Sequence, residues 1–75
     1  MAYNGHKNWN HWNVSLWLNN DEMLYREALA YKSEEGSAAK AAPLYLDWLR
    51  GLGVTHTPDG APYSVSAIQA AMRGL

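Results

Sequence analysis

Apolar residues recur at helical spacing in four stretches of the chain, and no stretch keeps the period-two alternation of a half-buried strand. The pattern therefore predicts an all-α fold, a compact small helical bundle of three main helices plus a short fourth around a tryptophan-rich core. The first helix is expected near residues 9–18, with Asn8 or Asn10 as its N-cap.

Two adjacent faces of this first helix are apolar, one formed by Trp9, Trp12 and Leu16 and the other by Val14, Trp17 and Leu18. Such a short helix is not stable alone, so it must pack against the rest of the chain. Large rings bury much area per residue, which favours a core position for the tryptophans. The residues predicted to form the core are Trp9, Trp12, Asn13, Leu16, Trp17, Leu24, Trp48 and Ile68.

A sharp corner is predicted directly after the first helix. Asn19 and Glu22 have the spacing of a capping box, and Leu18 and Met23 then have the spacing of a hydrophobic staple. The second helix is expected from about Asn20 to Glu34, because these signals mark its start.

One face of the second helix is apolar, formed by Leu24, Ala28 and Tyr31 and widened by Tyr25 and Leu29. Arg26 follows Glu22 by four residues, the favourable order for a helical ion pair. Gly36 is the expected end of this helix, because glycine readily adopts the left-handed conformation of a helix C-terminus.

Pro43 complicates the third helix. A proline at the sixth helical position removes a hydrogen bond and clashes with the preceding turn, so we expect the helix to start close to Pro43. The alternative is a helix that starts in the alanine-rich segment 37–42 and is kinked at the proline. The expected buried stripe is Leu44, Trp48 and Leu52 with Tyr45 and Leu49, and the expected end is at Gly51 and Gly53.

Residues 53–62 are predicted to be a loop. Its Thr57-Pro58-Asp59-Gly60 segment is typical of a β-turn, because proline presets φ and glycine tolerates a positive φ. Ser64 or Ser66 is expected to cap a last helix, and Ser66 with Gln69 has capping-box spacing. The apolar face of that helix is predicted to be Val65, Ile68, Met72 and Leu75.

Length and composition place these elements in one domain, residues 1–75, with an irregular lead-in at residues 1–7. The chain has no cysteine, which excludes disulfides and thiolate metal sites. Its net charge of −1 argues against an electrostatically driven nucleic-acid binder. No apolar run is long enough for a membrane span and no signal peptide is recognisable, so a cytoplasmic protein is expected.

The segment Asn8–Asp21 carries a distinctive pattern centred on Trp-Asn-Val-x-Leu-Trp. It resembles a motif of small uncharacterised proteins of tailed phages and prophages, which reads roughly Asn-Tyr-Glu-Thr-Trp-Asn-Val-x-Leu-Trp-x-x-Asn-Asp. The matching positions are Asn8, Trp12, Asn13, Val14, Leu16, Trp17, Asn20 and Asp21, whereas Trp9, Asn10 and His11 replace the tyrosine, the acidic residue and the threonine. The resemblance implies a phage or mobile-element origin and a helical fold, and it implies no activity. Small phage proteins are often inhibitors of host systems, anti-CRISPR proteins among them, which is an analogy of class.

Catalytic chemistry is not indicated. His6 and His11 are five residues apart, which does not place them on one helical face, so no metal site and no cofactor are expected. No serine lies in a nucleophile motif and no glycine-rich phosphate loop is present, so we expect no enzyme activity. Asn13 within its apolar helix must be hydrogen-bonded if buried, either structurally, to the backbone of the loop or to a tyrosine hydroxyl, or in contact with a partner.

The second helix is the predicted contact face for a partner. Its acidic residues mark its two ends, and its tyrosines and arginine are residue types that interfaces favour. The predicted partner-binding residues are Asp21, Glu22, Tyr25, Arg26, Tyr31, Glu34 and Glu35. The leading hypothesis is a phage-encoded interaction factor that binds a host defence complex, such as one that processes nucleic acid, and inhibits it sterically in the cytoplasm of the infected bacterium. The alternatives are a small nucleic-acid-associated phage regulator and a homodimeric structural or accessory protein.

Overall fold

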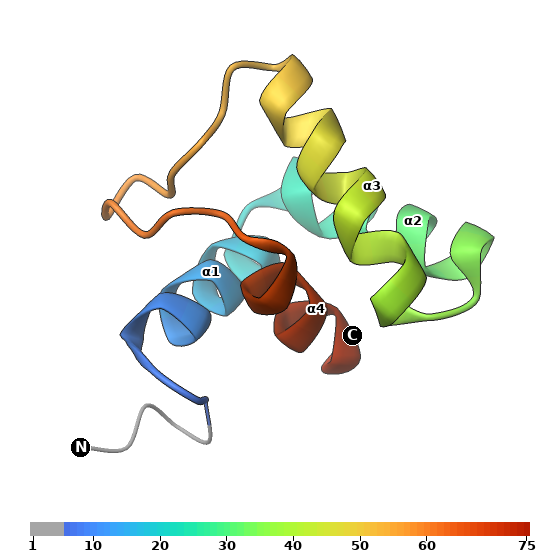
Figure 1. Cartoon of the computed structure of the whole chain (residues 1–75), viewed down its shortest axis with the longest axis horizontal. Helices are drawn as coiled ribbons and strands as arrows, with labels where there is room; N and C mark the ends of the chain where they lie inside the picture. The colour runs from blue at the N-terminus through green and yellow to red at the C-terminus, as the bar shows by residue number, and fades with distance from the viewer. Residues whose placement is uncertain (1–5) are drawn as a thin grey trace.

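The structure, a computed structural model, describes residues 6–75 and folds them into four helices with no strand (Figure 1). The helices are α1 (Trp9–Asn20), α2 (Glu22–Glu35), α3 (Ala38–Gly51) and α4 (Val65–Arg73). The predicted all-α class is confirmed, and α4 is the shortest helix at nine residues. Of the predicted lead-in, residues 1–5 lie outside the described part, and His6 and Lys7 precede α1.

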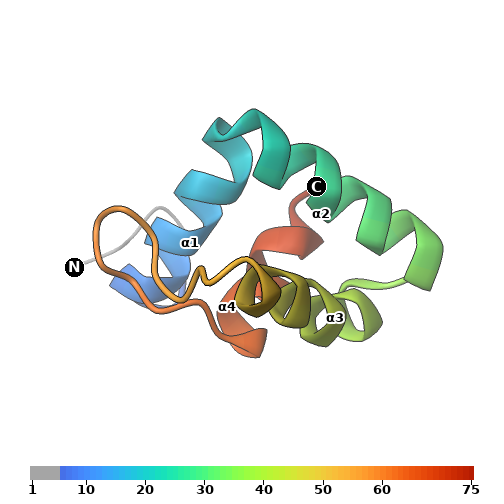
Figure 2. The ribbon, with the colours of Figure 1, turned by 90° about the horizontal axis from the view of Figure 1, so that it is seen from above.

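Helix α4 packs mainly on α1 and α3 and also contacts α2. Helices α1 and α4 lie side by side, α2 packs on α3, and the loop that joins α3 to α4 runs beside α1 (Figures 1 and 2). The radius of gyration is 11.2 Å, and a compact domain of this length has about 11 Å.

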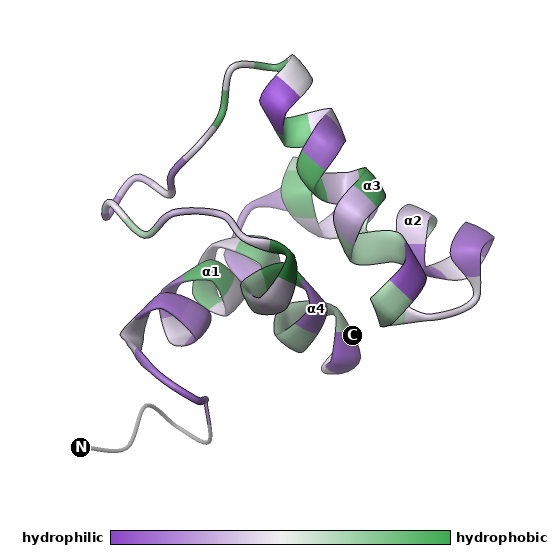
Figure 3. Ribbon diagram, in the orientation of Figure 1, coloured by the Kyte–Doolittle hydropathy of each residue, from purple (hydrophilic) through white to green (hydrophobic). Residues whose placement is uncertain are grey.

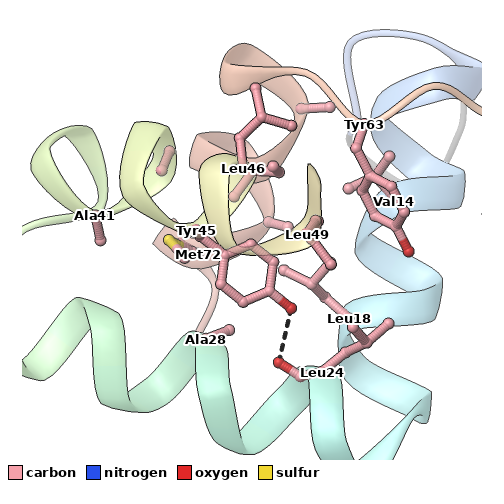
Figure 4. Packing of buried hydrophobic residues seen from close by; sticks show 14 of the residues in the cluster. Val14, Leu18, Leu24, Ala28, Ala41, Tyr45, Leu46, Leu49, Tyr63 and Met72 are labelled. Atoms are coloured by element: carbon pink, nitrogen blue, oxygen red, sulfur yellow. Dashed lines mark hydrogen bonds between the residues drawn. The ribbon is translucent and has the colours of Figure 1, made fainter. Parts of the chain in front are cut away.

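Small side chains make up much of the core between these helices. Seven alanines are buried together with larger residues, of which Tyr45, Leu18, Leu49, Ile68, Met72 and Val14 are completely enclosed. The Tyr45 hydroxyl donates a hydrogen bond to the backbone oxygen of Leu24 at 3.0 Å, which joins α3 to α2 in the interior (Figure 4). Burial raises the pKa of Tyr45 well above its ordinary value, so the hydroxyl stays protonated. Of the predicted core residues, those that are buried are Asn13, Leu24 and Ile68.

The prediction of a tryptophan-rich core is wrong. Trp9 is 39% exposed, and Trp12 and Leu16 are half-buried. Trp17 and Trp48 pack against the edge of the core without entering it. The physical reason is the alanine content of α3 and α4, because small side chains bring helix backbones close together and leave no space for an indole between them.

The corner between α1 and α2 forms two residues later than predicted. Helix α1 continues through Asn20, so Asn19 stays helical and its amide donates to the Ser15 carbonyl at 2.8 Å. The N-cap of α2 is instead Asp21, whose carboxylate accepts from the Leu24 N–H at 3.0 Å. The predicted staple is absent, because Met23 is 55% exposed.

The predicted end of α2 and its predicted ion pair are both present. Gly36 terminates it with φ of 83°, and the predicted ion pair between Arg26 and Glu22 is present on its surface. The apolar face is narrower than expected, because Tyr25 and Leu29 are exposed.

The preferred start of α3 at Pro43 is wrong. The Ser37 side chain caps the helix by accepting from the Lys40 N–H at 3.2 Å, and the helix continues through Pro43 at its sixth position. Alanine has the highest helix propensity, so the alanine-rich first turn offsets one missing hydrogen bond. The buried face of α3 also differs from the prediction. Leu44 and Leu52 are exposed, and the buried residues are Ala38, Ala41, Ala42, Tyr45, Leu46 and Leu49.

Helix α4 has one of the two predicted residues, Ser64, as its N-cap. The Ser64 side chain accepts from the Ala67 N–H at 3.2 Å, so the predicted box of Ser66 and Gln69 does not form. Val65 is exposed, contrary to prediction, while Ile68 and Met72 are buried.

Candidate functional site

The loop of residues 54–63 is attached to α1 through the side chain of Asn13, which is 1% exposed. The Asn13 amide nitrogen donates to the Asp59 carboxylate at 2.9 Å. The Thr57 hydroxyl donates to the Asn13 amide oxygen at 2.5 Å, and the indole N–H of Trp17 donates to the same Asp59 oxygen at 2.9 Å. We call these four residues the Asn13–Asp59 network. The structural interpretation of Asn13 is therefore correct, although its partners are loop side chains instead of backbone or tyrosine.

Thr57 also organises the loop itself. Its hydroxyl accepts from the Ala61 N–H at 3.0 Å, and its own N–H donates to the Ala61 carbonyl at 2.8 Å. The predicted turn is confirmed, because the Gly60 N–H donates to the Thr57 carbonyl at 2.9 Å and Gly60 has φ of 96°. Asn10 adds a second connection to α1 by donating to the Pro62 carbonyl at 3.2 Å. The loop therefore has a defined shape and a defined position.

Asp59 is the electrostatic centre of the network. Hydrogen bonds from Asn13 and then from Trp17 hold the pKa of the Asp59 carboxyl below its ordinary value of 3.8. A carboxylate that accepts two such bonds is stabilised in its charged form. The loop therefore presents a fixed negative charge beside the Trp17 ring.

Several residues of the tryptophan-containing motif have structural roles. Asn8 caps α1 by accepting from the His11 N–H at 2.9 Å, Val14 is fully buried, and Asp21 caps α2. Asn13 and Trp17 hold the loop. This part of the motif thus specifies two helix starts and the attachment of a distant loop.

A groove opens between this loop and the corner of α1 and α2. It has a volume of about 350 Å³, and it is lined by Trp17, Asp21, Met23, Leu24, Val54, His56, Pro58 and Tyr63. Most of these side chains are apolar or aromatic, and Asp21 and His56 are the polar ones. We call it the corner groove. Such a concave apolar surface with a few polar groups suits a protruding side chain of a partner.

The predicted partner-binding residues do not form one surface. Asp21 caps α2, and Tyr31 packs against Tyr45 and Trp48 with ring centroids 5.7 and 6.3 Å away. Glu34 and Glu35 lie at the opposite end of α2 from Asp21, about 20 Å along the helix axis.

Three of the predicted contact residues share the exposed outer face of α2, namely Glu22, Tyr25 and Arg26. Only Asp21 among the predicted set lines the corner groove. Sequence reasoning missed Val54, Pro58 and Tyr63, because they acquire a shared surface only when the loop is held against α1. The turn pattern at residues 57–60 was the one local signal that this loop is ordered.

Within residues 6–75, no three His, Asp or Glu side chains are grouped in a way that could hold a metal ion. None of the helices in this part of the chain combines the length and apolar character needed to cross a bilayer. Residues 6–75 thus form a fold of four helices with an apolar groove beside an anchored loop.

The whole chain, residues 1–75, matches a family described as "Family of unknown function (DUF7249)", and the protein belongs to that family. No curated protein matches the chain, and no solved structure matches it.

Proposed function

We propose that this protein is a phage-encoded interaction factor that binds a host defence complex through the corner groove and blocks it sterically, without turnover. The observation that carries the proposal is the groove itself, an apolar concavity whose walls come from α1, α2 and the anchored loop. The resemblance of Asn8–Asp21 to tailed-phage proteins supports the phage setting and the cytoplasm of the infected bacterium.

The chemistry of the groove favours a partner surface that combines an apolar side chain with lysine or arginine. Trp17 and the 55% exposed Met23 line the groove with large apolar side chains, and interface energy concentrates in such anchors. Asp21 lines the groove, and Asp59 is hydrogen-bonded to the Trp17 indole. These two carboxylates complement positive charge on a partner, which speeds and orients association. Complexes that handle nucleic acid expose such basic surfaces.

Pre-organisation also supports binding at this place. The loop wall of the groove is held to α1 by the Asn13–Asp59 network, with partner atoms between 2.5 and 2.9 Å apart. A surface that is ordered before binding loses less conformational entropy when the complex forms.

The test is affinity capture of the tagged protein from its bacterial host, with Met23→Lys compared against the double variant Glu34→Lys/Glu35→Lys. Met23 is 55% exposed and lysine is a good helix former, so circular dichroism should show an unchanged fold. We expect a stoichiometric partner that the wild type and the double variant retain and that Met23→Lys loses. Loss in the double variant alone would move the contact to the far end of α2, and retention of no partner would refute the proposal.

A further inference from the structure

A second concavity lies between the start of α1 and the outer face of α4. It has a volume of about 570 Å³ and is lined by His6, Lys7, His11, Ser66, Gln69, Ala70 and Arg73. Pockets that bind small molecules typically measure about 300–1,000 Å³. We call it the polar pocket.

Helical spacing explains how α4 supplies one wall of this pocket. Ser66, Gln69, Ala70 and Arg73 recur at intervals of three and four residues, which places them on one face. The opposite face of α4 carries the buried residues of the core. The start of α1 and the last turn of α4 accordingly contain hydrophilic residues, which are drawn in purple in Figure 3.

The two walls are joined by His11, which is 9% exposed. Its Nε2 atom lies 3.1 Å from the Ser66 hydroxyl, within hydrogen-bond distance. Burial, and then the charges of Lys7, His6 and Arg73, lower the pKa of His11 below its ordinary value of 6.5. The lowered pKa favours the neutral form of His11 at pH 7, and Lys7 and Arg73 supply fixed positive charge to the pocket.

The charge of the pocket is not compensated by the surrounding protein. None of its described lining residues is acidic, and within residues 6–75 neither Lys7 nor Arg73 takes part in an ion pair. A cleft lined by one sign of charge concentrates ligands of the opposite sign. Arginine adds a planar set of N–H donors that matches an oxyanion.

We propose that the polar pocket binds the phosphate monoester group of a small molecule. A phosphate monoester carries a charge of about −1.5 to −2 at neutral pH, which matches the two fixed cations. Arg73 and Lys7 supply charge-assisted hydrogen bonds, and the Ser66 hydroxyl and the Gln69 amide supply neutral ones. The remaining volume accommodates the group that the phosphate is attached to.

The other cations argue for a small molecule over a polynucleotide. Arg26 is paired with Glu22, and Lys32 donates to the Leu75 carbonyl at 2.9 Å. Lys40 and Arg50 lie on α3, away from the start of α1 (Figure 1). A nucleic-acid surface needs a continuous basic stripe, whereas Lys7 and Arg73 share one concavity and Lys40 and Arg50 lie apart from it.

The experiment is an NMR titration of the full chain with inorganic phosphate and with adenosine 5′-monophosphate, at constant ionic strength adjusted with chloride. We expect saturable shifts confined to the pocket lining, at Lys7, His11, Ser66, Gln69 and Arg73. Arg73→Gln should weaken the affinity at least tenfold, while Arg50→Gln, which removes an equal charge outside the pocket, should leave it unchanged. Non-saturating shifts, or equal affinities in the two variants, would overturn the proposal.

The pKa of His11 gives a readout that a purely structural role of the pocket would not move. A bound phosphate offsets the positive charges that lower this pKa, so saturation with phosphate should raise it in the wild type. An unchanged His11 pKa at saturation would overturn the assignment. A thymidine oligonucleotide is the remaining arm, and shifts that spread from the pocket to Lys40 and Arg50 would replace the small-molecule proposal by nucleic-acid binding.

Discussion

Replacing Thr57 by valine keeps the shape of a side chain that is 4% exposed and removes its hydroxyl. That hydroxyl donates to the Asn13 amide oxygen at 2.5 Å and accepts from the Ala61 N–H at 3.0 Å. Asn13 and Ala61 are themselves buried, so Thr57→Val leaves one acceptor and one donor without a partner in the interior. The substitution therefore isolates the hydrogen bonds of the loop from its packing.

The expected cost follows from these two groups. A buried polar group that loses its partner costs about 1–3 kcal/mol. Burial of the additional valine methyl offsets a part of the combined cost of the two unpaired groups. We expect the free energy of unfolding to fall by about 2–4 kcal/mol. For a domain of this size each kcal/mol corresponds to about 4–8 °C, so Tm should fall by about 10–25 °C.

The assay is urea and thermal unfolding, followed by far-ultraviolet circular dichroism and by tryptophan fluorescence. Fluorescence is informative here because the Trp17 indole is bonded to the same loop. Thr55→Val is the matched control, since the one hydrogen bond of the Thr55 hydroxyl in the described structure is an exposed one, to His56 Nδ1 at 2.9 Å. It should stay within about 0.5 kcal/mol of the wild type. Equal stabilities of the two variants would refute the anchoring role of Thr57.

Three further substitutions test other parts of the fold. Tyr45→Phe removes the buried bond to the Leu24 carbonyl and should cost about 1 kcal/mol in urea unfolding; an unchanged midpoint would contradict that. Pro43→Ala restores an N–H inside α3 and should raise Tm, because proline is about 3 kcal/mol less favourable than alanine in a helix interior. Proline also restricts the unfolded chain, which offsets a part of that difference. A lower Tm would show that the proline stabilises the fold. The folded pKa of Asp59 lies below its ordinary value of 3.8, so the stability that its charge confers is present above about pH 4 and is lost as pH falls through the folded pKa. Asp59→Asn should therefore flatten the dependence of Tm on pH below about pH 4, and an unaltered slope would argue against this linkage.

Local signals predicted several helix ends. Gly36 has the predicted role, and Asn8 is one of the two caps that were predicted for α1, because a cap depends on the few residues around it. At the corner, Asn19 and Asp21 are both good caps. The length of α1 decides between them, and burial of Leu18 in the core extends α1 past Asn19.

Tertiary features were harder to predict from the sequence. Periodicity indicates which faces of the helices are apolar, but it does not show how closely two helices approach. Trp9 and Trp48 were therefore predicted to lie in the core, whereas the alanines of α3 are the buried residues. The Asn13–Asp59 network joins residues 46 positions apart, and no local pattern connects them. The corner groove depends on this network, so its loop residues could not be assigned.

The same network has a consequence for how the chain folds. Helices α2 and α3 are neighbours in sequence and pack on each other, so their hairpin can form early from local contacts. Helix α1 packs mainly on α4. Bringing these two helices together closes the long chain segment between them into a loop, which costs conformational entropy before their contacts form. Folding should therefore begin in the α2–α3 hairpin and end when α1, α4 and the loop come together, with a rate below that of helical bundles whose helices pack only on their sequence neighbours.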